Sequence, residues 1–385
     1  MILTNAQLRK RIAEDLAHFV VDRISNKYEN HIHHAMPDSR SISRNGLMPD
    51  ARSRINEELF IPKKEYFSMY PTPEEGQLGI SGFDIRFGKF VAWTDTVRQD
   101  VAGLNLMDLP HKILEPGEKF ILNHDSEGGK VYYVTSFESI SLPSDLEMII
   151  DSKSTTGRVG AMSHGVGQTS KREIVTMIQP YSFPLEITCG KTSLSQAVIR
   201  FRNSQYMDVE KILSGNFVKL DSDGQSLEEN LTSNGLSMKF ATRLIYRAKK
   251  CDTPIDMDAK KTINPKDYWE KIEGKTKIKL DAKTLYLLGS LGKIELGASC
   301  GLLSREEEVL TGTGTWGHFA GIFQPFWKGG VTMEVYGFGK REIFKGDRAG
   351  VVKFDEVELK SEGIYNGTYQ NQKPPMLPRM FREFP

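Results

Sequence analysis

The chain has 385 residues, enough for about two or three domains of ordinary size. It carries 51 Lys and Arg against 50 Asp and Glu, and this net charge of +1 offers no basic surplus to a nucleic-acid polymer. No run approaches the roughly 20 apolar residues of a membrane-spanning helix, and the three cysteines lie too far apart for a disulfide framework or a zinc site. The start also lacks the long apolar core of a signal peptide, so these features together predict a reduced, soluble, cytoplasmic protein without a membrane anchor.

Residues 1–61 are expected to form a helix followed by a polar arm. Thr4 can cap a helix whose apolar residues share one face at helical spacing, namely Leu8, Ile12, Leu16 and Phe19. Residues 26–60 are rich in His, Ser, Arg and Asn. The histidines there (His31, His33 and His34) lack a partnering cluster of Cys or carboxylates, so the segment predicts a solvated arm without a metal.

Strands dominate the remainder of the predicted structure. Short apolar runs bounded by Gly, Pro and Asn predict strands, for example at 83–87, 130–134, 147–150 and 197–201. We expect a first β unit over 62–220, a polar linker over 221–235, a second β unit over 236–358 and a C-terminal tail over 359–385. One short helix is predicted at 265–270.

The two strand-rich halves look like copies of one unit. Residues 131–142 can be laid over residues 285–296 at an offset of 154 positions, with a shared rhythm of apolar and polar residues. We favour a duplication over a chance likeness between two sheets. The predicted fold class is therefore mainly β, with two tandem units, a short N-terminal helix and few other helices.

Four motifs follow one another in the first half. They are D-x-R-x-G within residues 80–88, L-x-P-G-E at 114–118, a segment of the form E-x-x-x-L-P-x-D-L within 136–146, and K-S-T-x-x-R-x-G within 152–160. In this order and spacing they resemble the deoxycytidine triphosphate deaminases, relatives of the trimeric deoxyuridine triphosphatases (dUTPases). Residues 246–249, 267–269 and 369–372 extend the resemblance to a two-domain bacterial branch, in which one chain carries two such units.

The resemblance implies a fold. It is the dUTPase-like fold, a distorted β-barrel or jelly roll with little helix, present here in two tandem copies. This expectation agrees with the strands predicted from periodicity alone.

Ser154, Thr155 and Arg158 are the best candidates for phosphate binding. Their turn offers hydroxyls and closely spaced backbone N–H groups, and an arginine presents a fork of donors to phosphate oxygens. An ordinary polar loop is the alternative. The resemblance implies that Ser154 and Arg158 also reach the pyrimidine and the attacking water, and that Lys153 and Gly157 of the same motif help to bind the substrate.

Glu334 is the candidate catalytic carboxylate. Deamination of cytosine needs a base that activates water for attack at C4 and an acid that protonates N3 and the leaving ammonia, and one buried carboxylate can do both in turn. The resemblance places Glu334 on the strand after a pyrimidine-binding hairpin, with His318, Ala320, Phe323 and Gln324 as substrate-binding residues. An exposed strand glutamate is the alternative. The H-x-E and P-C-x-x-C signature of zinc deaminases is absent.

Each half keeps one part of this site. The first half has Met177 where the resemblance expects the catalytic Glu, and the second has Arg305 and three carboxylates, at 306–308, where it expects the Ser/Arg motif. Three clustered carboxylates would repel a triphosphate. We therefore predict one composite site that joins the Ser154–Arg158 loop to the Glu334 hairpin, and both a single chain and neighbouring chains could supply its two parts.

Three further features bear on the composite site. Gln324 replaces the family's Asp at the sugar 3′-hydroxyl, and its amide can still donate and accept hydrogen bonds. Phe326 replaces the Gly that usually follows the proline, which we expect to change the turn. Tyr369 and Gln372 lie in a tail segment that resembles one closing over bound nucleotide, so a lid is weighed there against a disordered terminus.

The leading hypothesis is a metal-independent hydrolytic deaminase of a cytosine deoxynucleotide, with dCTP giving dUTP and ammonia. Mg²⁺ would be carried by the substrate triphosphate, with no protein-bound zinc. One alternative is a dUTP pyrophosphatase, alone or combined with the deaminase, with Asp84 as a candidate holder of the attacking water. The other is a non-catalytic nucleotide-binding protein. The resemblance also implies a homo-oligomer, for which three chains would give a closed form.

Overall fold

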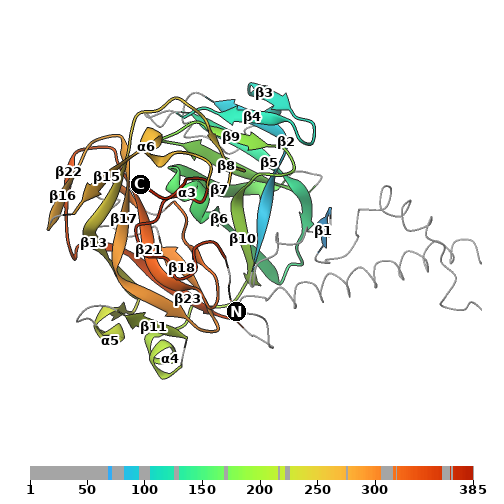
Figure 1. The fold of residues 1–385 in the computed structure, drawn as a ribbon. Coiled ribbons are helices and arrows are strands. Elements are labelled where there is room, and N and C mark those ends of the chain that lie inside the picture. Colours follow the sequence, from blue (N-terminus) through green and yellow to red (C-terminus); the bar gives the residue numbers. More distant parts are fainter. Residues whose placement is uncertain are drawn as a thin grey trace, which may run out of the picture.

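Strands make up most of the computed structural model, and they fall into two groups along the chain (Figure 1). The structure describes residues 68–71, 82–94, 105–124, 130–168, 172–215, 217–221, 226–274, 276–304, 315–317, 319–357, 365 and 367–384. The predicted N-terminal helix and arm lie outside these residues, as do His318 and the carboxylates at 306–308. Within the described part of the chain, no helix is long and apolar enough to cross a membrane.

The first half forms a closed barrel of six strands. Its elements are β1 (Ser68–Tyr70), β2 (Gly82–Thr94), η1 (Leu106–Asp108), β3 (His111–Ile113), β4 (Lys119–Leu122), β5 (Val131–Ser141), β6 (Leu146–Ser152), α3 (Ser154–Arg158), β7 (Ala161–Gln168), β8 (Glu173–Pro180), β9 (Leu185–Thr188) and β10 (Ser193–Phe201). The barrel runs in the order β5-β8-β7-β6-β10-β2, and the pairing of β2 with β5 closes it.

Aromatic and β-branched residues explain why these segments are strands. β5 begins Val-Tyr-Tyr-Val-Thr, and such side chains suit a pleated surface that is covered by a core. Tyr132 and Val134 of β5 are almost fully buried and belong to one core cluster with Val91 of β2. The four segments predicted as strands lie in β2, β5, β6 and β10, so those predictions are confirmed.

The second half is an open half-barrel. Its elements are α4 (Val209–Ser214), β11 (Val218–Asp221), α5 (Leu227–Asn230), β12 (Leu231–Thr232), β13 (Gly235–Ala248), β14 (Ile255–Asp256), α6 (Pro265–Tyr268), β15 (Trp269–Glu273), β16 (Lys277–Leu280), β17 (Thr284–Leu296), β18 (Ser299–Ser304), β19 (Thr315–Gly317), β20 (Ile322–Phe323), β21 (Lys328–Gly337), β22 (Arg341–Phe344) and β23 (Arg348–Glu356). The main sheet runs β19-β21-β17-β13-β23-β18-β20.

Strand register shows that the two halves repeat one arrangement. In the first half Tyr133 of β5 lies between Ala92 of β2 and Met177 of β8. In the second half Leu287 of β17 lies between Tyr246 of β13 and Glu334 of β21. Leu287 follows Tyr133 by 154 positions, and Tyr246 follows Ala92 by the same number. The mainly β fold class with two tandem units is confirmed, and Met177 and Glu334 occupy equivalent positions.

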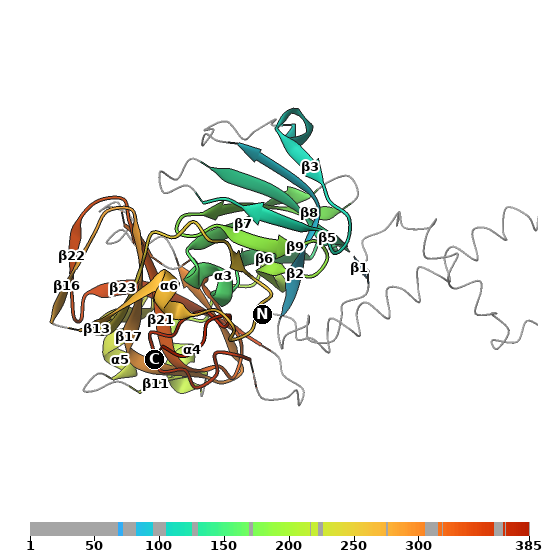
Figure 2. The same cartoon turned by 45° about the horizontal axis from the view of Figure 1, so that its top comes forward.

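The halves share a continuous core. Phe183 of the first half packs edge-on against Tyr268 and Trp269 of the second, with ring centroids 5.6 and 5.4 Å apart. The Arg200 guanidinium of β10 donates to the buried Asp355 carboxylate of β23 at 2.9 Å. Figures 1 and 2 both show the halves side by side with α3 at their boundary, so the composite site is built on a shared hydrophobic contact.

Three segments differ from the sequence-based expectations. The 154–158 motif, weighed as a loop, is one turn of helix. The described part of the 221–235 segment, predicted as a linker, contains α5 and β12, because Ser226 caps the helix through a full capping box with Glu229. The preceding strand β11 pairs with β17 of the second half. The predicted helix at 265–270 ends at Tyr268, and β15 begins at Trp269.

Candidate active site

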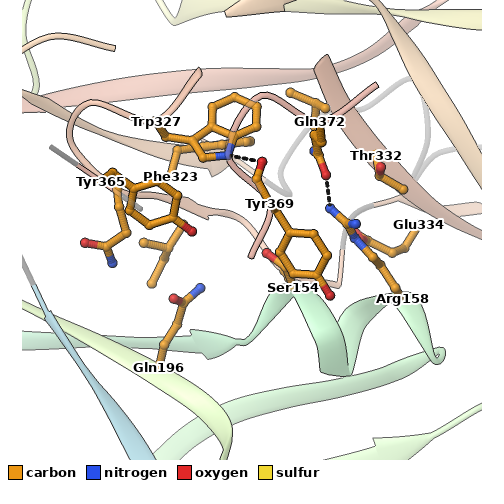
Figure 3. Close-up of a pocket in the computed structure, with 14 residues that line it drawn as sticks. Ser154, Arg158, Gln196, Phe323, Trp327, Thr332, Glu334, Tyr365, Tyr369 and Gln372 are labelled. Carbon is orange, nitrogen blue, oxygen red and sulfur yellow. Dashed lines mark hydrogen bonds and ion pairs between the residues drawn. The ribbon is translucent and has the colours of Figure 1, made fainter. Parts of the chain in front are cut away.

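A narrow pocket lies where α3 meets the second half (Figure 3). The first half contributes Ser154 and Arg158 from α3 and Gln196 from β10. The remaining lining residues come from the second half and the C-terminal segment: Ala320, Ile322, Phe323, Gln324, Trp327, Val331, Thr332, Glu334, Tyr365, Tyr369 and Gln372. Among these described residues, the charged side chains are Arg158 and Glu334.

Helix α3 carries the predicted Ser/Arg motif to the boundary. It begins directly after β6, with Lys153 as an extended N-cap, and its last four residues are buried. Gly157 lies against the opposite half, because a Cβ built on it would lie 3.0 Å from Ala320 Cβ and 3.1 Å from Ala320 N. The absence of a side chain at 157 therefore lets the turn around Ala320 approach the helix closely.

Arg158 is enclosed in the pocket, with 3% of its surface exposed. Its Nη2 donates to Gln372 Oε1 at 2.8 Å and its Nη1 to the Met376 carbonyl at 3.1 Å. The Tyr369 ring lies over the guanidinium, with 3.8 Å from Cζ to the ring centroid. Burial lowers the pKa of Arg158, while Tyr369 and Glu334 act in the opposite direction.

Glu334 lies on β21 beside Arg158. Its Oε1 is 3.8 Å from Arg158 Nε, and the residue is 2% exposed. Both partners belong to one chain and to different halves, so a single chain brings the two predicted parts of the site together. The exposed strand glutamate weighed as the alternative is not what the structure shows.

Lys153 and Asp84 form an ion pair at the edge of the motif. Asp84 lies on β2, and its register partner on β10 is Gln196 of the pocket. Lys153, predicted to bind substrate, and Asp84, the candidate water holder of the pyrophosphatase alternative, therefore neutralise each other in this structure. Thr155, also predicted to bind substrate, has its hydroxyl 2.9 Å from the Tyr369 hydroxyl.

The turn that carries Ala320, Phe323 and Gln324 is held to the first half. Asp151, at the end of β6, accepts a hydrogen bond from Gly321 N at 2.7 Å and another from Ser152 N at 2.7 Å. These bonds tie the predicted pyrimidine-binding segment to the base of α3.

The tight turn before β21 keeps a glycine-like shape. Trp327 N donates to the Gln324 carbonyl at 3.2 Å, and Phe326 has φ of 60°. That is the left-handed conformation for which glycine is usually needed in such a turn. Backbone and side-chain hydrogen bonds hold Phe326 in this conformation, including one from Gln370 Nε2 to its carbonyl at 2.9 Å.

The C-terminal segment is docked on the second half. Trp327 Nε1 donates to the Tyr369 carbonyl at 3.1 Å, and Gln372 Nε2 donates to the Gly330 carbonyl at 2.6 Å. Further along, Phe381 is 4% exposed and pairs with Ile263 through an isolated bridge. The disordered terminus weighed from the sequence does not describe residues 367–384.

Gln196, Thr332 and Tyr365 line the pocket and escaped the sequence analysis. For Gln196 a signal existed, because it is the polar residue between Ser195 and the apolar run at 197–199 of a barrel strand. Its register partners, Asp84 and Asp151, are polar as well. For Thr332 and Tyr365 the sequence held no comparable signal.

No metal-binding group was found in the described part of the chain. No set of three or more His, Cys, Asp or Glu side chains gathers there with the geometry of an ion site.

Of the residues proposed to act on substrate, eight meet in the pocket: Ser154, Arg158, Ala320, Phe323, Gln324, Glu334, Tyr369 and Gln372.

Part of the chain is similar to a known protein family. Residues 202–343 match the family model described as 2'-deoxycytidine 5'-triphosphate deaminase (DCD), C-terminal domain. The fold is similar to that of the crystal structure of 2'-deoxycytidine 5'-triphosphate deaminase from Agrobacterium tumefaciens, with a TM-score of 0.65 and 20% identity over 77% of this chain and 94% of that chain. No curated protein sequence matches the chain. Residues 202–343 are therefore similar to the C-terminal domain of the 2'-deoxycytidine 5'-triphosphate deaminase family.

Proposed function

We propose that the chain hydrolytically deaminates a cytosine deoxynucleotide, with dCTP as the expected substrate and dUTP and ammonia as products. The observation that supports this most is the meeting of Arg158 and Glu334, 3.8 Å apart in one buried pocket although they come from different halves. Because burying a charge is costly unless a partner is close, such a pair is typical of a functional site.

Glu334 is the proton-transferring group in this proposal. It takes a proton from water as the oxygen attacks C4, and passes that proton to N3. It then moves the proton of the new hydroxyl to the amino nitrogen. The C4–N4 bond breaks, ammonia leaves, and C4 keeps a carbonyl oxygen, so all atoms of water and cytosine are accounted for.

Arg158 lies beside the carboxylate that acts in the first step. Its Nε is buried, donates no hydrogen bond within the described structure and faces Glu334, so this N–H can bind an oxygen or nitrogen of the reacting group. Ser154 supplies a hydroxyl at the same end of the pocket. Phe323, Trp327 and Tyr365 provide aromatic surface on which a pyrimidine can stack.

The triphosphate is expected to carry its own Mg²⁺. Assembly into a homo-oligomer and a cytoplasmic location stay predictions.

Ammonia release from dCTP and Mg²⁺ tests the proposal. We expect Glu334→Gln to lower turnover by about 10²- to 10⁴-fold, because the amide cannot accept the proton of water. Met177→Ala is the matched control at the equivalent position of the first half, and it should leave turnover unchanged.

Three outcomes would redirect the proposal. Equal turnover by Glu334→Gln and wild type would contradict the role of Glu334. Pyrophosphate release from dUTP without ammonia release from dCTP would favour the pyrophosphatase alternative. Saturable nucleotide binding without either product would favour a non-catalytic binding protein.

A further inference from the structure

The C-terminal segment, residues 367–376, contacts the Arg158 guanidinium on two edges and one face. Gln372 Oε1 accepts from Nη2 at 2.8 Å, the Met376 carbonyl accepts from Nη1 at 3.1 Å, and the Tyr369 ring covers one face at 3.8 Å (Figure 3). The Nε edge faces Glu334, and Nε lies 3.8 Å from Glu334 Oε1. The segment thus determines which edge of the guanidinium faces the carboxylate.

The segment is bonded to β21, the strand that carries Glu334. Gly330 N donates to the Gln372 carbonyl at 3.1 Å, and Gln372 Nε2 returns a bond to the Gly330 carbonyl at 2.6 Å. Further along the segment, Met376 N donates to Thr332 Oγ1 at 3.0 Å. Gln372 is 6% exposed, so its amide is a buried link between Arg158 and the strand.

Two glycines make room for the segment where it crosses the sheet. A Cβ on Gly330 would overlap Pro374 Cγ and Cδ, and a Cβ on Gly289 of β17 would lie 3.1 Å from the Pro374 carbonyl carbon. Beyond the crossing, Leu377, Met380 and Phe381 enter the main hydrophobic core. Because the segment packs against these two glycines and continues into the core, it cannot move away from the sheet without exposing that core to water.

We propose that residues 367–376 are a fixed positioning element of the active site. Pro374 packs against Gly330 and holds Gln372 in place, and Gln372 orients Arg158 toward Glu334. This inference rests on the proposed function. It gives residues 367–376 a fixed position, in contrast to a lid that opens and closes at every turnover. Gln372 acts here through Arg158, so its loss should disturb the chemical step more than the binding of substrate.

Steady-state kinetics of two variants test the positioning role. Gln372→Met keeps the side-chain length and removes both amide hydrogen bonds, and Gly330→Ala displaces Pro374 without touching the pocket. We expect each to lower kcat by on the order of 100-fold, since a misplacement of about 1 Å can cost that much, while KM stays within about threefold. Gly339→Ala is the matched control, because a Cβ there meets nothing within 4 Å.

A raised KM with an unchanged kcat in Gln372→Met would overturn the positioning role and leave the proposed deaminase standing. Thermal melts of both variants report whether either has lost its fold.

Hydrogen exchange of the ligand-free wild type tests the fixed wall without any need for activity. We expect the amides of Asn371 and Met376 to exchange slowly, because they donate to Lys328 O and Thr332 Oγ1, and to change little when dCTP is added. Rapid exchange of residues 367–376 that slows only with nucleotide would overturn the inference. Slow exchange in a protein that releases no ammonia would instead count against the proposed function alone.

Discussion

At the scale of single residues, the site depends on side chains that are small, or that accept more than one hydrogen bond. Gly157 allows helix and turn to touch, and Asp151 binds the turn through its carboxylate. Phe326 shows the opposite case, a bulky residue held at φ of 60° by its surroundings. Such a conformation is costly for a residue other than glycine, and it persists because neighbouring contacts determine it.

Asp151→Asn is expected to loosen the contact between the halves. The carboxylate accepts from Gly321 N and Ser152 N, whereas the amide would turn an N–H₂ group toward one of these donors. We expect a loss of about 1–3 kcal/mol in the free energy of unfolding, together with a lower kcat/KM. Chemical denaturation measures the first, and Asp252→Asn at an exposed position is the control. Unchanged stability in both variants would show that the bond to Gly321 does not hold the turn.

At the scale of elements, the two halves carry the candidate reacting groups on different parts of the repeated unit. β6 of the first half leads into helix α3, which carries the arginine, whereas β21 of the second half carries the glutamate. Neither barrel has both groups among its described residues. The contact of α3 with the turn at 319–321 therefore matters more to the site than the regularity of either sheet.

The C-terminal segment is expected to behave as part of the core. Phe381 is 4% exposed and packs against Tyr268 with ring centroids 5.4 Å apart. Phe381→Ala should lower the free energy of unfolding by about 3–5 kcal/mol, as for other buried aromatic truncations. Arg382→Ala, at the exposed neighbouring position, should change it by less than about 0.5 kcal/mol. Equal melting temperatures for the two variants would argue that the segment is only loosely attached.

At the scale of the whole molecule, one chain holds a complete Arg158–Glu334 pair. Mixing the inactive variants Arg158→Ala and Glu334→Gln is therefore expected to restore no activity, because each chain still lacks one residue of its own site. The mixture should be prepared by joint refolding so that subunits can exchange. Recovery of about a quarter of the wild-type rate, as random pairing of exchanged subunits would give, would place the working site between chains.

Buried tyrosines predict alkaline instability. Burial raises the pKa of Tyr181, Tyr246, Tyr268, Tyr286 and Tyr365 above the usual value of 10.0. The folded state keeps these hydroxyls protonated while the unfolded state ionises them, so stability is intact below pH 10 and falls as the pH rises further. Tyr181 alone contributes at most about 1.4 kcal/mol per pH unit.

Melting temperature against pH, recorded with tyrosinate absorbance, checks this expectation. Tyr181→Phe should make the alkaline decline shallower. Tyrosinate absorbance that rises well before unfolding would contradict the assignment, since it would show that the buried hydroxyls ionise in the folded protein.

The sequence by itself determined the strand pattern, the duplication and the candidate reacting groups. Apolar runs such as 130–134 and 197–201 predict strands from local sequence alone. A short motif such as 154–158 is recognisable because its chemistry depends on residues that are neighbours in the sequence. The sequence also placed Met177 where a catalytic Glu was expected, and strand register shows that Met177 and Glu334 are equivalent, because Met177 pairs with Tyr133 and Glu334 pairs with Leu287.

The tertiary structure alone decided which groups meet. Arg158 and Glu334 are 176 positions apart, and no local pattern reports that they lie 3.8 Å from each other within one chain. Packing between distant segments likewise produces three other features. These are the hydrogen bond from Arg158 to Gln372, the contact of Pro374 with Gly330 and the left-handed backbone of Phe326. Such contacts depend on how two sheets and a tail fill shared space, and local sequence preferences do not encode that arrangement.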